Sequence, residues 1–148
     1  MGTLNNVVQS NMQIPALADA KKRLWAGRIL SFAPALFLLF DGVMKLVKPA
    51  FVVEATMRLG YPERVIFGLG VVLLTCTLIY LIPRTAVLGA ILLTGYLGGA
   101  VATHVRAGQG WFEILFPVVL GILLWGGLVL RDERLRTLFS PKHLRLHE

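Results

Sequence analysis

Long apolar segments without charged residues alternate with short polar segments along most of the chain. Uncharged runs of 17 to 19 residues occupy Val65–Ile82, Thr85–Thr103 and Ile114–Leu130. A fourth apolar segment, Trp25–Val47, is longer but carries three charged side chains. A helix of about 20 residues crosses the ~30 Å hydrocarbon core of a bilayer. The pattern therefore predicts four membrane-spanning helices.

Short connections determine how these helices follow one another. The second and third segments are joined by "IPRT", residues 82–85, and the third and fourth by "AGQG", residues 107–110. Links this short force antiparallel neighbours. Residues 50–62, "AFVVEATMRLGYP", are too short and too charged to cross a membrane. Because Glu54 and Arg58 lie four apart, opposite an apolar face, the segment is predicted to form an amphipathic helix on the membrane surface.

These elements predict an all-α integral membrane protein. Its architecture is an antiparallel four-helix bundle with a short amphipathic surface helix between spans 1 and 2. Residues 1–20 are polar and lack clear periodicity, so we expect a loosely ordered N-terminal segment. The first helix is expected to start near Lys21, with Asp19 as its cap. The membrane domain then covers residues 21–138, and residues 139–148 form a basic tail.

Small residues recur along the third apolar segment. They form two neighbouring rows on a helix, Ala86, Ala90, Thr94, Gly98 and Ala102, and Gly95, Gly99 and Thr103. In lipid, helices associate through close van der Waals contact, which small side chains permit. We therefore expect the third span at the centre of the bundle, with another helix of the same chain in its groove. Internal packing is favoured over homodimer formation because three partner helices are tethered nearby.

The composition agrees with a membrane protein. The 148 residues are 56% hydrophobic and 16% charged, whereas soluble domains carry about 25% charged residues. With four spans, ten of the 15 Lys and Arg residues fall on the side of both termini, which predicts that this side is cytoplasmic. The ten are Lys21, Lys22, Arg23, Arg28, Arg84, Arg131, Arg134, Arg136, Lys142 and Arg145. The net charge of +7 therefore reports topology, and we expect a lipid bilayer, not nucleic acid, as the partner.

Ionisable residues from distant parts of the chain are predicted to lie at similar depth near the outer leaflet. The candidate ligand-binding residues are Asp41, Lys45, Tyr96, His104, Arg106 and Glu113. A charge inside a membrane is costly unless it is paired or hydrated. The available pairs are Asp41 with Lys45 or Arg106, and Glu113 with Arg106 or His104. Two interpretations stay open: a structural clasp, or the lining of a ligand pocket with residues 50–62 as its lid.

The cysteines and histidines of the chain are too few to indicate a particular metal or haem cofactor. Cys76, the single cysteine, is expected to be a buried thiol, which excludes intramolecular disulfides and cysteine metal clusters. His104 is the single histidine of the bundle, since His143 and His147 lie in the tail, so two-histidine haem ligation is not expected. No spacing motif supports a metal site, although a carboxylate–histidine relay is compatible with quinone binding or transport.

Several stretches resemble the DoxX-like family of small four-span membrane proteins. They are "FDGVMKLVKP" (40–49), "LGYP" (59–62), "YLIPRTAVLGAILLTGYLGGAVATHVR" (80–106) and "LLWGGLVLRDERLR" (123–136). The resemblance implies a membrane-embedded antiparallel bundle in a bacterial inner membrane. It also implies an association with redox complexes, because the family name comes from a subunit of a thiosulfate:quinone oxidoreductase. It defines no catalytic residues.

The favoured hypothesis is an accessory or redox-associated subunit that binds a quinone-like lipophilic molecule at the polar site. A membrane oxidoreductase or a second copy of the chain would be its protein partner. Two alternatives belong to other classes: a small-solute carrier acting as an oligomer, and a non-catalytic membrane scaffold. Whether the chain is an enzyme stays open at this stage.

Overall fold

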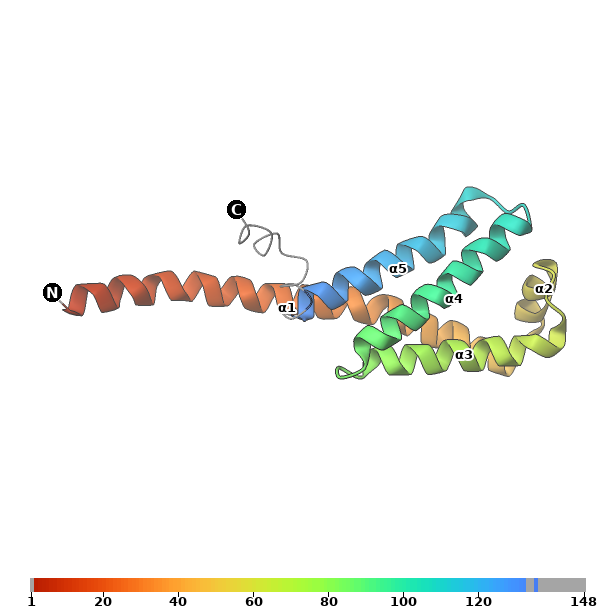
Figure 1. Cartoon of the computed structure of the whole chain (residues 1–148), viewed down its shortest axis with the longest axis horizontal. Helices are drawn as coiled ribbons and strands as arrows, with labels where there is room; N and C mark the ends of the chain where they lie inside the picture. Colours follow the sequence, from red (N-terminus) through yellow and green to blue (C-terminus); the bar gives the residue numbers. More distant parts are fainter. Residues whose placement is uncertain (1, 133–134, 136–148) are drawn as a thin grey trace, which may run out of the picture.

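The structure is a computed structural model and describes residues 2–132 and 135. Five helices follow one another along this part of the chain (Figure 1): α1 (Gly2–Val47), α2 (Ala50–Arg58), α3 (Glu63–Leu81), α4 (Ala86–Arg106) and α5 (Trp111–Arg131). The predicted all-α fold, with a short helix between the first two spans, is confirmed. The predicted basic tail, 139–148, lies outside the described residues.

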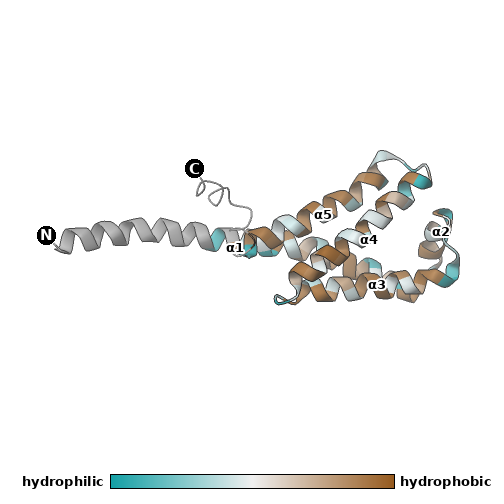
Figure 2. Ribbon diagram, viewed as in Figure 1, coloured by the Kyte–Doolittle hydropathy of each residue, from teal (hydrophilic) through white to brown (hydrophobic). Residues whose placement is uncertain are grey.

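Four described helical segments are long and apolar enough to cross a membrane. They are Leu24–Val47 within α1 and the whole of α3, α4 and α5. Hydrophobic residues dominate these helices, whereas hydrophilic residues gather near their ends and around α2 (Figure 2). Trp25 and Trp111 are exposed at opposite ends of the bundle, as expected for aromatic side chains in the two interfacial layers. The chain is therefore a multi-pass integral membrane protein.

The start of α1 differs from the prediction. The helix runs without interruption from Gly2 to Val47, and its first half projects beyond the other helices (Figure 1). A helix start near Lys21 with Asp19 as its cap is therefore wrong. Polar residues such as those of the N-terminal segment are compatible with a helix when they continue one that is already formed, because elongation needs no new nucleus.

The four spans form a ring in which α4 is not central. Among the described residues, α1 packs against α3 and α5, α4 packs against the same two helices, and the backbones of α1 and α4 do not approach each other closely. The predicted central position of α4 is therefore wrong. At Gly95, Gly98 and Gly99 an added Cβ would meet no described atom within 4 Å, so no helix of the described residues fills the predicted groove. The buried face of α4 comprises Ala86, Gly89, Ala90, Leu93, Leu97 and Thr103.

Glycines instead bring other pairs of helices together. An added Cβ on Gly70 of α3 would lie 3.0 Å from the Gly42 carbonyl oxygen of α1. An added Cβ on Gly127 of α5 would lie 3.0 Å from the Gly27 carbonyl oxygen of α1. At Gly89 of α4 it would come still closer to the backbone of α3. The principle that small residues allow close approach thus holds, but at other positions than the sequence rows suggested.

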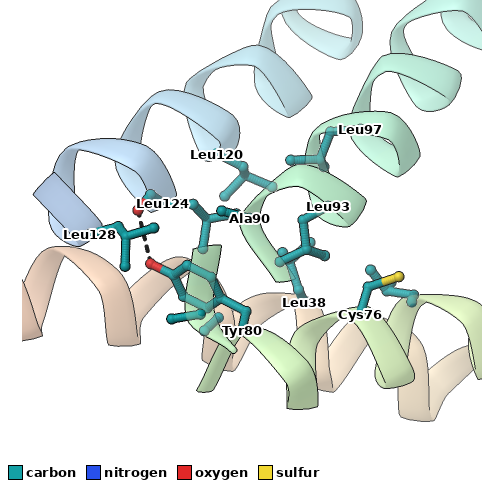
Figure 3. Packing of buried hydrophobic residues seen from close by; sticks show 12 residues of the cluster. Leu38, Cys76, Tyr80, Ala90, Leu93, Leu97, Leu120, Leu124 and Leu128 are labelled. Carbon is teal, nitrogen blue, oxygen red and sulfur yellow. Dashed lines mark hydrogen bonds between the residues drawn. The ribbon is translucent and has the colours of Figure 1, made fainter. Parts of the chain in front are cut away.

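The core lies where the four spans face one another. Leucines from all four dominate it (Figure 3), and the fully buried Tyr80 of α3 lies among them. Its hydroxyl donates a hydrogen bond to the Leu124 carbonyl oxygen of α5 at 2.8 Å. The Arg131 guanidinium lies 5.1 Å from the Tyr80 ring centroid, a cation–π distance. Tyr80 therefore joins α3 to α5 near the end of the bundle where α5 finishes. Cys76 is buried, as predicted.

Candidate functional site

The end of the bundle that carries α2 holds most of the candidate site. From their connecting turn, α3 and α4 diverge, and α2 lies at their far ends (Figure 1). The chain enters α2 through Lys48, which has a positive φ of 54°, and leaves it through Gly60, with φ 86°. Residues with a side chain rarely adopt this left-handed backbone conformation. These two sharp backbone turns set the position of α2.

Two hydrogen bonds fasten the turn after α2 to the end of α4. The Tyr61 and Thr103 hydroxyl oxygens lie 2.8 Å apart. Because Thr103 gives its one proton to the Gly99 carbonyl oxygen, Tyr61 is the donor to Thr103. Arg106 Nη2 donates to the carbonyl oxygen of Leu59, the C-cap of α2, at 3.1 Å. A cation there also complements the negative end of the helix dipole.

An ion pair lies inside the first span, near the end of α1 that leads to α2. Asp41 and Lys45 are one helical turn apart on α1, and Lys45 Nζ donates to Asp41 Oδ2, which confirms one of the predicted pairings. The Lys45 side chain is 15% exposed and that of Asp41 is 35% exposed. The Lys45 stem packs over Gly70 of α3, where the missing side chain leaves room for it. Pairing lowers the cost of both charges in the membrane.

Tyr96 of α4 adds a phenol to this part of the bundle. It is partly buried and packs against the hydrophobic core. The α2-end cluster, as we name it, consists of Asp41, Lys45, Tyr61, Tyr96 and Thr103. Its members come from α1, from the turn between α2 and α3, and from α4. It therefore contains phenol, ammonium, hydroxyl and carboxylate groups, with two internal contacts, Lys45 to Asp41 and Tyr61 to Thr103.

The remaining predicted pairings are wrong. In the described part of the chain, no ion pair joins Arg106 to Asp41 or to Glu113. His104 Nδ1 lies 2.8 Å from Gln109 Oε1 in the following turn and does not pair with Glu113. Glu113 is exposed in the first turn of α5 and folds back toward that helix start, where its charge complements the dipole. Arg106, His104 and Glu113 instead interact with groups at nearby helix ends and turns.

Three polar residues of this region were missed by the sequence analysis: Tyr61, Thr103 and Gln109. Tyr61 stands in the "LGYP" turn and Thr103 in a row of small residues, so each was assigned a role in turn formation or packing. A phenol directly before a proline in a membrane-surface turn was the one available signal. His104 and Gln109, five residues apart across a helix end, have no periodicity that would identify them as a pair.

The donor set of the cluster suits an organic ligand better than a metal ion. Within the described residues, no group of three or more His, Cys, Asp or Glu side chains lies close enough to hold a metal. Lys45 has two further N–H donors beyond the one used by Asp41, and the Asp41 carboxylate has unused acceptor positions. Such groups can recognise the oxygen atoms of a ring carbonyl or hydroxyl.

These features define the class of protein: a small multi-pass membrane bundle with a polar cluster at one end of its spans. The chain belongs to the DoxX-like family, whose sequence profile matches residues 29–127. The matched region begins inside α1, ends inside α5, and contains the whole α2-end cluster. Comparison with curated proteins gives no match, and comparison with solved structures gives none either.

Proposed function

We propose that this DoxX-like membrane protein is an accessory subunit that binds a quinone-like lipophilic molecule at the α2-end cluster. The carrying observation is the Asp41–Lys45 ion pair, held in an apolar span with Asp41 still 35% exposed. A charge pair serving packing alone would be costly there, because apolar residues pack as well without any desolvation cost. Intramembrane ionisable residues are therefore functional candidates by default.

Each member of the cluster has a suitable role toward such a ligand. Lys45 and the Tyr96 hydroxyl would donate hydrogen bonds to a ring carbonyl, while Asp41 would accept one from a ring hydroxyl. The ring would lie against the apolar walls of the spans, and the turn held by Tyr61 and Thr103 would cover it. Electron transfer would take place in a partner oxidoreductase, and this chain would hold the lipophilic molecule for it.

The proposal includes a bacterial inner membrane with both termini in the cytoplasm, and the Lys and Arg distribution supports this orientation of the termini. Arg84 lies in the turn between α3 and α4, and Gln109 in the turn between α4 and α5. Cysteine substitutions at these two positions, in a Cys76→Ala background, test the topology. An impermeant thiol reagent should label position 109 from outside intact spheroplasts and position 84 after permeabilisation. The opposite order would reverse the topology.

Bound quinone can be measured directly in protein purified with its native lipids. Asp41→Asn and Tyr96→Phe should each lower the quinone content per protein by about tenfold, the effect of a lost hydrogen bond to a charged group or a buried phenol. Glu54→Gln is the matched control, because Glu54 and Arg58 form an ion pair of the same spacing on the exposed surface of α2. Its quinone content should equal that of the unmodified protein.

Other outcomes would identify the alternatives. Equal quinone content in all variants, or none in the unmodified protein, would contradict the proposal. If the variants unfold more easily while the host pathway keeps its activity, the ion pair is a structural clasp and the scaffold hypothesis holds. Solute flux through liposomes that contain the isolated protein would instead support a carrier.

A further inference from the structure

A groove runs along the membrane-facing side of α4 and α5, apart from the α2-end cluster. Its volume is about 860 Å³, within the range of small-molecule sites. It is bordered from Val101 and Pro117 at one end to Leu130 at the other, with Gly98, Gly121 and Gly126 among its lining residues. The glycines deepen the groove because they carry no side chains.

The lining of the groove is almost wholly apolar and offers no free donor. Trp125 Nε1 donates to Thr94 Oγ1 at 2.9 Å, and Thr94 in turn donates to the Ala90 carbonyl oxygen. Both polar groups are thus satisfied within the protein. A polar solute would find no partner here, whereas a hydrocarbon chain requires none.

The length of the groove fits a lipid chain. Its α5 wall, from Pro117 to Leu130, spans about 20 Å at 1.5 Å per residue. One leaflet accounts for about 15 Å, half of the ~30 Å hydrocarbon core. A chain that enters at the Leu130 end therefore fits along the groove.

Charge at the Leu130 end indicates which lipid the groove would favour. Lys21, Lys22, Arg28 and Arg84 are exposed at the end of the bundle where α5 finishes. Arg131 follows Leu130 directly but lies over the Tyr80 ring, and Asp132 is an acidic residue next to it. Basic residues at a membrane surface attract anionic headgroups. We propose that the groove between α4 and α5 binds an acyl chain of an anionic phospholipid, with the headgroup at the Leu130 end. This site is independent of the proposed quinone site.

Trp125 provides the readout, because its indole lines the groove. The Trp25→Phe/Trp111→Phe double variant leaves it as the single tryptophan. The full chain is reconstituted in vesicles of phosphatidylcholine and phosphatidylglycerol, with bromine on the acyl chains of one lipid at a time. Brominated phosphatidylglycerol should quench Trp125 with about fivefold higher apparent affinity, the effect of roughly one basic residue near the surface. Equal quenching by both lipids would overturn the proposal.

Substitutions in and beside the groove separate specific binding from general lipid contact. Gly98→Leu places a side chain in the groove, its Cβ would meet nothing within 4 Å, and it should abolish the preference for phosphatidylglycerol. Gly95→Leu is the control: it lies on the same helix with equal free space but does not line the groove, and should keep the preference. If Gly98→Cys forms a disulfide-linked dimer in a Cys76→Ala background and quenching is weak, a second copy covers the groove and the proposal is wrong.

Discussion

Individual glycine residues determine how closely the helices of this bundle approach one another. Gly42 and Gly70 lie at the α1–α3 contact, and Gly27 and Gly127 at the α1–α5 contact. In a membrane, where association brings little hydrophobic gain, such contacts supply much of the packing energy. Gly98 is chemically identical but faces open space. The contribution of a glycine to packing therefore depends on whether it faces another helix or open space.

Alanine at two of these glycines should have opposite consequences. In Gly127→Ala the added Cβ would lie 2.6 Å from the Ser31 backbone nitrogen, so we expect a loss of about 1 to 3 kcal/mol in the free energy of unfolding. Gly98→Ala meets nothing and should stay within about 0.5 kcal/mol. Unfolding by SDS in mixed micelles measures both. Equal stability of the two variants would contradict the close contact between α1 and α5.

The orientation of each helix about its axis also explains which polar pairs could be predicted from the sequence. Asp41 and Lys45 share one helix at a spacing of four residues, so their contact follows from helix geometry alone. Arg106 lies at the end of α4 and donates to the Leu59 carbonyl of another element. A backbone carbonyl cannot be recognised in the sequence as the partner of a particular side chain. Partners within one helix are thus predictable, and partners across elements are not.

At the level of elements, α2 behaves as a cover fixed at few points. It is a helix of nine residues, bounded by backbone turns at Lys48 and Gly60. Its amphipathic sequence predicted the element, and Gly60 and Pro62 predicted where it ends. Its attachment to α4 by Tyr61 and Arg106 was not predicted, because it depends on how far α3 and α4 diverge.

Removal of these attachments should loosen α2 without unfolding the bundle. Tyr61→Phe and Arg106→Gln each remove about 1 kcal/mol of hydrogen bonding, so amide exchange in residues 50–60 should accelerate about fivefold. Exchange in α3 should not change. Arg58→Gln serves as the control, because that side chain is exposed and bonds within α2 to Glu54. Unchanged exchange in both variants would mean that other contacts hold α2.

The architecture of the whole molecule was the most predictable level. Hydropathy over 17 or more residues identifies spans without knowledge of their neighbours, and turns of about four residues fix their antiparallel order. The arrangement around the ring was not predicted: small-residue rows pointed to α4 as the centre, yet α1 and α4 lie at opposite corners. A row of small residues reports a smooth helix face, but not whether that face meets protein or lipid.

The central claim is that the α2-end cluster is a binding site for a quinone-like molecule in the membrane. A photoreactive quinone analogue, added to the full chain in lipid vesicles and mapped by mass spectrometry, tests it directly. We predict that adducts concentrate on the peptides containing Asp41, Lys45 and Tyr96, and that excess unlabelled quinone suppresses them. Adducts spread evenly over the lipid-facing helices, or concentrated at Trp125 in the α4–α5 groove, would contradict the claim.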